Sequence, residues 1–144
     1  MEDSYTYEVD LEWNEEKKGT VRAGSLPDLE VATPPEFPGG HGGIWSPEQL
    51  LVASVVSCIM NTFLAIAENS KLEFTSYTAH GTGTIEKVEK AYRFTAVTVG
   101  VDLVIPDESK ASRAERILQM AEQNCFISNS LSANVTIEPN VTVG

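Results

Sequence analysis

The chain has 144 residues, of which 42% are hydrophobic and 22% are charged, proportions that fit one globular domain with a core of its own. Its formal net charge of −11 argues against nucleic acid and anionic membranes as partners, because both would repel an acidic surface. The segment Met1–Ser4 is acidic and no apolar stretch follows it. We therefore expect no secretory signal and a cytoplasmic location, where thiols are kept reduced.

The first part of the chain predicts three strands and a loop. Residues 5–13 alternate between apolar and polar side chains, which predicts a half-buried strand with one apolar face: Tyr5, Tyr7, Val9, Leu11 and Trp13. Residues 20–23 and 29–32 predict two short strands around a turn. Residues 33–43 are rich in proline and glycine and predict an irregular loop, which lacks the Lys-Ser/Thr ending of a phosphate-binding loop.

Residues 46–70 predict a long helix. Ser46 suits the N-cap, Pro47 suits the first helical position, and Gln49 completes a capping box with Ser46. After Leu50 apolar residues fall on every face, which predicts a helix buried all round and a fold built around it. One chain of this size would not cover such a helix alone.

The same helix is long and apolar enough to be considered as a membrane span. Four polar residues interrupt it, and no basic flank marks a cytoplasmic side: Ser54, Ser57, Asn61 and Thr62. We therefore predict that it does not cross a membrane.

The second half of the chain predicts a hairpin, a helix and a last strand. Residues 72–86 and 92–105 predict the two strands of the hairpin, and residues 135–143 predict a closing strand in which Pro139 indicates an edge or a bulge. Between them an apolar stripe at helical spacing predicts a second helix: Ala114, Ile117, Leu118, Ala121 and Cys125. The order of three strands, helix, two strands, helix and strand is typical of an α+β fold with mainly antiparallel sheet, here as a single domain over residues 1–144.

Cys58 and Cys125 are the only cysteines, and each is predicted on the inward face of one of the two helices. Either one alone is typical of a small hydrophobic core residue, and burial would make it inert. Together they permit redox chemistry, because one thiol is oxidised by a substrate and the second resolves it as a disulfide. They lie 67 positions apart, so a local metal-binding knuckle is excluded.

Two other chemistries stay open as weaker alternatives. A zinc site would combine the cysteines with His41 and His80, but it lacks the short paired spacings of such sites. A Cys-His-Asn hydrolase would need its nucleophile at an exposed helix start rather than three turns into a helix. We therefore predict no metal.

Glu48 lies in the first turn of the long helix, where a carboxylate also simply stabilises the helix end. Cys58 follows ten residues later, about 15 Å further along a straight helix, so Glu48 does not reach the thiol of its own chain. If Glu48 takes part in the chemistry, it acts across a dimer two-fold. A reactive Cys58 also needs a cation, and Lys17 and Arg22 are the candidates, with Arg22 flanked by apolar residues in a predicted strand.

Two motifs of the chain resemble the OsmC/Ohr family of thiol-dependent peroxidases. The first consists of residues 46–51 followed by Ser57-Cys58, and the second extends from Cys125 to Leu131. The second motif is similar to that family's Cys-Pro-Val-Ser-x-x-Leu segment, with Phe126 in place of the proline. The resemblance implies a swapped homodimer with long helices at its centre and two active sites at the interface. It implies that Cys58 is peroxidatic, that Cys125 is the resolving residue and that Glu48 pairs with an active-site arginine.

One feature departs from the Ohr branch of that family. The stretch 16–19 carries Lys17 where an arginine is expected, and Arg22 stands nearby as a substitute. Lysine is a single flexible point charge, whereas arginine offers a rigid fork that holds two anionic groups together.

The resemblance implies reduction of organic hydroperoxides to alcohols through a Cys58 sulfenic acid and an intrachain disulfide. A lipoyl-type or thioredoxin-type dithiol would then reduce the disulfide, and no bound cofactor is needed. Apolar residues near both cysteines favour a hydroperoxide with an apolar tail. The alternative is an OsmC-like dimer without peroxidase activity, which binds an apolar ligand or has another redox or stress role.

Overall fold

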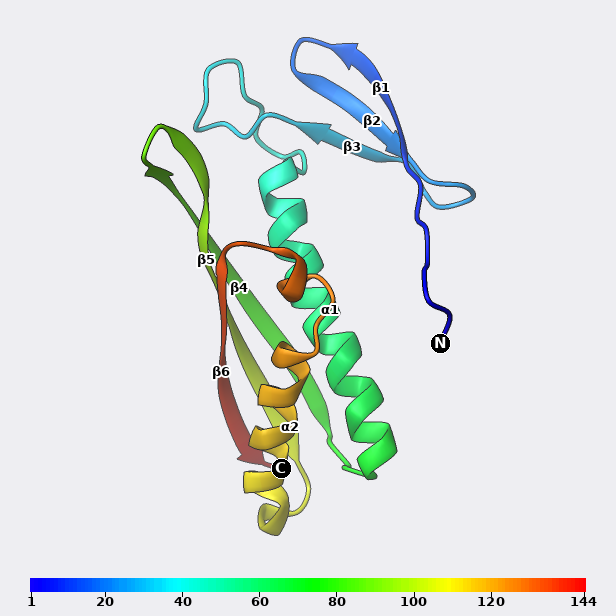
Figure 1. Ribbon diagram of the computed structural model, residues 1–144, viewed down its shortest axis with the longest axis vertical. Helices are drawn as coiled ribbons and strands as arrows, with labels where there is room; N and C mark the ends of the chain where they lie inside the picture. The colour runs from blue at the N-terminus through cyan, green and yellow to red at the C-terminus, as the bar shows by residue number, and fades with distance from the viewer. The chain divides into compact units, whose positions relative to one another are not determined.

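The structure, a computed structural model, describes all residues 1–144 and has an α+β order of elements (Figure 1). The elements are β1 (Asp10–Glu15), β2 (Lys18–Arg22), β3 (Leu29–Ala32), α1 (Pro47–Ser70), β4 (Ser76–Val88), β5 (Ala91–Ile105), η1 (Glu108–Lys110), α2 (Ala111–Gln123), η2 (Ser128–Ser130) and β6 (Asn134–Val143). The predicted order of strands and helices is confirmed. The chain forms two compact units, residues 1–51 and 52–144. One domain over 1–144 stays a prediction.

The first unit holds an antiparallel sheet in the order β1-β2-β3. The predicted first strand is wrong in its start and in its burial. Pairing with β2 begins only at Asp10, opposite Arg22, because β2 is short and leaves residues 5–9 without a neighbouring strand. The expected apolar face is exposed, by 54% at Tyr5 and 89% at Tyr7 and to values between these at the other members: Val9, Leu11 and Trp13.

The capping box predicted for α1 is confirmed. The Gln49 backbone N–H donates to Ser46 Oγ at 3.1 Å, and the Ser46 backbone N–H donates to Gln49 Oε1 at 3.1 Å. The two bonds satisfy donors that a helix start leaves without partners, so the helix begins at Pro47.

The prediction that α1 is buried all round is wrong for a single chain. One stripe with a four-residue spacing is fully buried: Val55, Ile59, Phe63 and Ala67. Other apolar positions, such as Leu64, stay exposed because only one side of the helix lies on protein. Judged only by its length and composition, α1 is long and apolar enough to cross a membrane. A position outside the membrane stays a prediction.

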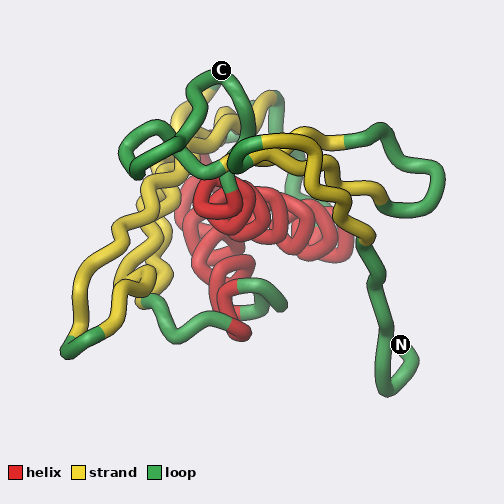
Figure 2. Tube along the Cα trace, turned by 90° about the horizontal axis from the view of Figure 1, so that it is seen from above, coloured by secondary structure: helices red, strands yellow, loops and turns green.

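The second unit holds a sheet in the order β4-β5-β6, with both helices on one face (Figures 1 and 2). β4 and β5 form the predicted antiparallel hairpin, but β6 is parallel to β5, from Ala96 opposite Asn134 to Ile105 opposite Val143. The expected mainly antiparallel pairing is confirmed by the other three strand pairs, and the β5–β6 pair is the one exception. A parallel pair needs a crossover, and α2 provides it. β6 lies at the sheet edge, as Pro139 predicted.

The core of this unit lies between the sheet and the helices. It contains the inward residues of β5 and the apolar stripe of α2: Val97, Val99, Val101, Leu103, Ile105, Ala114, Ile117, Leu118 and Ala121. Phe63 of α1 contacts Tyr77 of β4 with ring centroids 5.2 Å apart. Burial raises the pKa of Tyr77 to about 12, because an apolar environment disfavours the charged phenolate.

Cys125 lies just beyond α2 rather than within it, which corrects the predicted stripe. The helix ends at Gln123, where the backbone and side-chain N–H groups of Asn124 both donate to the Met120 carbonyl. Those bonds complete the last turn of α2, so the helical conformation ends before Cys125.

α1 approaches β4 closely because β4 carries glycine at two facing positions. A Cβ at Gly81 would lie 2.4 Å from Val56 Cγ2, and one at Gly83 would lie 2.6 Å from Val52 Cγ2. Real Cβ atoms do not approach other atoms this closely. The absence of side chains at Gly81 and Gly83 therefore sets how deeply α1 lies on the sheet.

We expect Gly81→Ala to destabilise the protein by about 1–3 kcal/mol, because the added methyl forces α1 away from β4. Gly100→Ala is the matched control on the neighbouring strand, where the nearest atom to a new Cβ is 3.9 Å away. It should change stability by less than about 1 kcal/mol. Urea unfolding at one fixed protein concentration measures both. Equal stability of the two variants would contradict the packing argument.

Candidate active site

The structure brings Cys58 and Cys125 together. Cys58 lies on α1 and is partly buried, whereas Cys125 follows α2 and is fully buried. Both are free thiols, and their sulfur atoms are within hydrogen-bonding contact of each other. Residues 67 positions apart in the sequence thus form one two-thiol site inside the second unit.

The surroundings of Cys58 favour its thiolate. Burial raises the pKa of Cys58, but hydrogen bonds from the Cys125 thiol and from the backbone N–H groups of Ile127 and Phe126 lower it by more. The net pKa of Cys58 lies below its usual value. These donors stabilise negative charge on sulfur without any formally charged group among them.

Thr62 is a further possible donor to the same sulfur. Its hydroxyl has one proton, and in the structure that proton goes to the Cys58 carbonyl oxygen at 2.8 Å. Thr62 therefore supports the thiolate only when its hydroxyl rotates away from the carbonyl. We assign the larger part of the stabilisation to the Cys125 segment.

Cys125 is shifted in the opposite direction. Burial raises the pKa of the Cys125 thiol, and the adjacent Cys58 sulfur raises it further. Ser128 partly offsets this shift, because its backbone N–H donates to Cys125 Sγ at 3.4 Å. The Ser128 hydroxyl is buried with no other partner, so its proton is also available to that sulfur. The site therefore pairs one thiol whose pKa is lowered, Cys58, with one whose pKa is raised, Cys125.

The other three predicted site residues lie in the first unit. Lys17 Nζ donates to the Pro38 carbonyl at 2.5 Å, and Arg22 Nε pairs with Asp28 Oδ2 at 3.3 Å. Arg22 is 46% exposed, so its side chain does not turn inward. Glu48 lies in the first turn of α1, and its Oε1 is buried without a hydrogen-bond partner. Both cations thus have partners within their own unit, whereas one oxygen of Glu48 has none.

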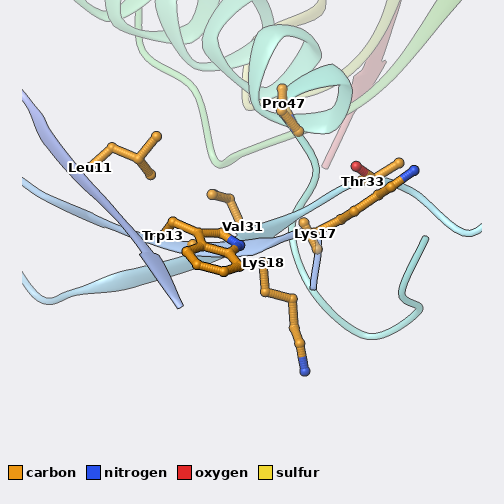
Figure 3. A pocket seen from close by; sticks show the side chains of 9 residues that line it. Leu11, Trp13, Lys17, Lys18, Val31, Thr33 and Pro47 are labelled. Atoms are coloured by element: carbon orange, nitrogen blue, oxygen red, sulfur yellow. The ribbon is translucent and has the colours of Figure 1, made fainter. Parts of the chain in front are cut away.

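A pocket of about 240 Å³ lies beside Lys17 in the first unit (Figure 3). Its lining is mostly apolar, with two lysine side chains: Leu11, Trp13, Lys17, Lys18, Gly19, Val31, Ala32, Thr33 and Pro47. The sequence pattern predicted strands at Leu11, Trp13, Val31 and Ala32 and a turn at residues 17–19, but not the pocket, because its walls come from four separate segments.

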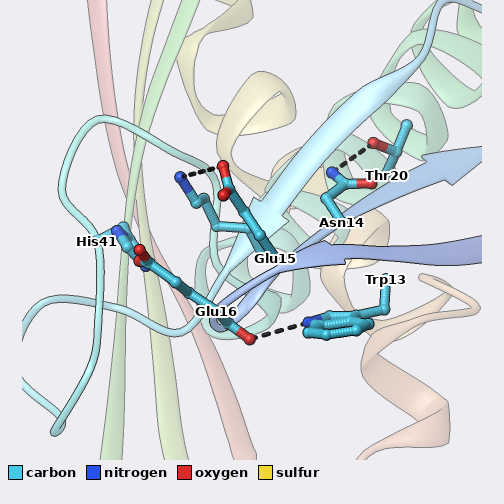
Figure 4. A network of polar contacts seen from close by, with 7 residues as sticks. Trp13, Asn14, Glu15, Glu16, Thr20 and His41 are labelled. Carbon is cyan, nitrogen blue, oxygen red and sulfur yellow. Dashed lines mark hydrogen bonds and ion pairs between the residues drawn. The ribbon is translucent and has the colours of Figure 1, made fainter.

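A network of polar contacts fixes the turn between β1 and β2 (Figure 4). Trp13 Nε1 donates to the Glu16 carbonyl at 2.9 Å, and His41 Nε2 lies 3.1 Å from Glu16 Oε2. His41 therefore ties the loop of residues 33–43 to this turn. His80, the other candidate zinc ligand, lies at an exposed position of β4. No group of three or more His, Cys, Asp or Glu side chains is arranged to hold a metal ion.

Comparison with known proteins identifies the family to which this chain belongs. Residues 40–140 match the family of OsmC-like proteins, and the chain belongs to that family. The predicted family membership is confirmed.

Individual relatives are distant but extend over most of the chain. An organic hydroperoxide resistance protein-like protein of Staphylococcus aureus is 26% identical over 116 residues, which are 81% of this chain and 80% of the relative. The uncharacterized protein YmaD of Bacillus subtilis is 22% identical over 133 residues, 90% and 87% of the two chains.

Solved structures share the fold. An OsmC-like protein of unknown function from Vibrio cholerae has a TM-score of 0.87 at 23% identity, covering 95% of this chain and 100% of the other. An organic hydroperoxide resistance protein OsmC from Legionella pneumophila has a TM-score of 0.76 at 23% identity, covering 98% and 99%. The OsmC-like architecture predicted from the sequence is confirmed.

We expect Cys58 to become reactive at lower pH than Cys125, because the thiolate is the reactive form and the two pKa values are shifted in opposite directions. Alkylation by iodoacetamide across a pH series, quantified for each cysteine by peptide mass spectrometry, measures this order. In denaturant the two thiols should react alike. Faster alkylation of Cys125 in the folded protein would contradict the assignment.

Proposed function

We propose that this protein is a thiol-dependent peroxidase that reduces organic hydroperoxides to alcohols. The observation that carries the proposal is the contact between two free thiols whose pKa values are shifted apart, down at Cys58 and up at Cys125. A peroxidase of this kind needs a nucleophilic thiolate and a second thiol that forms a disulfide with the first after the first has been oxidised. Membership of the OsmC-like family and relatives named for organic hydroperoxide resistance support the same function.

In the first step the Cys58 thiolate attacks the terminal oxygen of the hydroperoxide. An S–O bond forms, the O–O bond breaks, and the alkoxide takes a proton from solvent to leave as the alcohol. The product on the protein is a Cys58 sulfenic acid. The sulfur has lost two electrons, which the peroxide has gained.

In the second step Cys125 attacks the Cys58 sulfur. A disulfide forms and the sulfenic oxygen leaves as water, with the Cys125 proton as one of its hydrogens. The sulfur atoms already lie in contact, so this step requires only local adjustment. An external dithiol, of the lipoyl or thioredoxin type, then exchanges with the disulfide and supplies the two electrons that restore both thiols.

The assembly proposed for this function is a swapped homodimer. Two observations support an assembly in which a second copy covers apolar surface. α1 buries a single stripe, and the apolar face of residues 5–13 is exposed. The buried, unpaired Glu48 Oε1 adds a third, because a carboxylate oxygen without a donor is costly unless a cation or donor is supplied.

Within that dimer we assign Glu48, Lys17 and Arg22 to the surroundings of the hydroperoxide. Lys17 or Arg22 would replace the family arginine as the cation that pairs with Glu48 and faces the leaving oxygen. Each would first have to leave its present partner, Pro38 or Asp28. The apolar pocket beside Lys17 favours hydroperoxides with apolar tails over hydrogen peroxide. Cytoplasmic localisation stays a prediction.

We expect Cys58→Ser to abolish reduction of cumene hydroperoxide, because the nucleophile is lost. Without added thiol, Cys125→Ser should reduce about one equivalent per chain and then stop with Cys58 as a sulfenic acid, since no disulfide forms within the chain. Peroxide consumption and free-thiol counts after one equivalent of peroxide measure both. Wild-type turnover by Cys58→Ser would refute the proposal, and retention of both thiols in the wild type would favour the non-enzymatic apolar-ligand binder.

We expect Val9→Glu to weaken the dimer, raising its dissociation constant about 100-fold or more, because each copy would bury a carboxylate in the apolar interface. Glu8→Gln, on the opposite face of the same segment, is the matched control and should leave the dimer intact. Light scattering after size-exclusion chromatography gives the mass. An unchanged dimer in Val9→Glu would place the interface elsewhere, and a monomeric wild type would refute the dimer.

A further inference from the structure

Ser128 is a polar residue that the fold buries next to the two thiols. It follows Cys125 by three residues, at the start of η2, and only 7% of its surface is exposed. Its hydroxyl oxygen is buried and has no hydrogen-bond partner. A buried hydroxyl without an acceptor is unfavourable unless some state of the protein supplies one.

The acceptor that this turn leaves for the hydroxyl is Cys125 Sγ. The Ser128 backbone N–H already donates to that sulfur at 3.4 Å. Every carbonyl group of residues 125–128 is occupied, in order by the Asn129 N–H at 3.0 Å, the Ser130 hydroxyl at 2.8 Å, the Ser130 N–H at 3.0 Å and the Leu131 N–H at 3.3 Å. Both donors of Ser128 are therefore available to one sulfur atom.

These donors have their largest effect when the sulfur carries a charge. A neutral thiol is a weak acceptor, whereas hydrogen bonds to an ionised group are about twice as strong as neutral ones. Cys125 is fully buried, so a negative charge on its sulfur would be costly without such donors. Ser128 is thus suited to a step in which Cys125 becomes a thiolate.

Reduction of a Cys58–Cys125 disulfide is a step of that kind. An external thiolate attacks one sulfur of the disulfide, and the other sulfur leaves as a thiolate. Cys58 is partly exposed, whereas Cys125 is fully buried. Access from solvent therefore directs the attack to Cys58 Sγ and places the leaving charge on Cys125 Sγ, next to Ser128.

We propose that Ser128 stabilises the Cys125 thiolate that leaves when an external dithiol reduces the Cys58–Cys125 disulfide. The backbone N–H and the hydroxyl are the two donors. The inference rests on the proposed function, because the disulfide is an intermediate of that cycle. It adds the sulfur that the reductant attacks and the residue that assists the departure of the other sulfur.

In this step a thiolate of the dithiol forms a bond with Cys58 Sγ, and the Cys58–Cys125 bond breaks with its electron pair left on Cys125 Sγ. The second thiol of the reductant then displaces Cys58 and closes a disulfide within the reductant. The reductant loses two electrons and two protons, and the two cysteines take them up. Donors to the leaving sulfur lower its pKa, and a thiol of lower pKa leaves faster.

The test compares Ser128→Ala with Ser130→Ala in the full-length protein. Ser128→Ala removes the unpaired hydroxyl, whereas Ser130→Ala removes a hydroxyl of the same turn that donates to the Phe126 carbonyl instead. The disulfide is formed beforehand with diamide, and its reduction by excess dithiothreitol at one fixed pH is followed by counting free thiols. Ser128→Ala should be reduced about three- to tenfold more slowly than the wild type. Ser130→Ala should be reduced at the wild-type rate.

The direction of the change separates a lost donor from a loosened turn. A loosened turn would expose the disulfide, speed its reduction and open Cys125 to attack. Glutathione, a monothiol, followed by an acid quench and peptide mass spectrometry, shows which cysteine forms the mixed disulfide. It should be Cys58 in the wild type and in both variants. Unchanged or faster reduction of Ser128→Ala, equal slowing in Ser130→Ala, or glutathione mainly on Cys125 would overturn the proposal.

A second variant tests the donor whose bond to the sulfur is formed in the structure. Glyceric acid at position 128 replaces the backbone N–H by an ester oxygen and keeps the hydroxyl. It should also slow the reduction by dithiothreitol, and a wild-type rate would contradict the role of the N–H. This variant decides the matter if Ser128→Ala does not fold by circular dichroism.

Diamide forms the disulfide without hydroperoxide, so the measurements are independent of peroxidase activity. Slower reduction of Ser128→Ala in a protein that consumes no peroxide would refute the proposed function and leave the role of Ser128 intact. Normal peroxide turnover together with a wild-type reduction rate in Ser128→Ala would do the reverse. Failure of diamide to join the two thiols would refute both.

Discussion

The depth at which α1 lies on the β4–β5–β6 sheet controls the position of Cys58. Gly81 and Gly83 let two valines of α1 approach β4 more closely than any side chain would allow. Cys58 follows Val56 by two residues on the same helix, so the packing of Val56 on β4 also sets the distance of the Cys58 sulfur from the sheet. α2 and the loop after it are held on the same face by the parallel pairing of β6 with β5. The contact between the two thiols therefore depends on backbone packing across the whole second unit.

Much of this fold could be predicted from the sequence because its signals are local. Ser46, Pro47 and Gln49 define the start of α1 through a capping box that needs only four consecutive residues. The alternation along residues 97–105 likewise predicts the inward face of β5. The parallel orientation of β6 could not be predicted in this way, since it depends on the route of the crossover through α2 rather than on any residue of β6.

In the candidate site, too, some features could be predicted from local sequence signals and others could not. Cys58 and Cys125 could be found from the sequence, because they are the only thiols and stand in motifs that resemble one family. The backbone N–H groups of Phe126 and Ile127, which lower the pKa of Cys58, could not be found in this way, since every residue except proline carries such a group. The partners of Lys17 and Arg22 could not be predicted from the sequence pattern either, because loops bring Pro38 and Asp28 to them.

If the backbone N–H groups after Cys125 support the Cys58 thiolate, the task left for a cation changes. An arginine that both activates a thiolate and binds a peroxide has to satisfy two anionic groups with one fork. Hydrogen bonds that already hold the thiolate would relieve the cation of the first task, and a single point charge such as Lys17 would then suffice for the developing alkoxide and Glu48. Lysine in place of the family arginine and phenylalanine in place of the family proline are then two parts of one compensation. In the proposed peroxidase, main-chain donors would stabilise the charge on sulfur and the side-chain cation would face the oxygen that leaves.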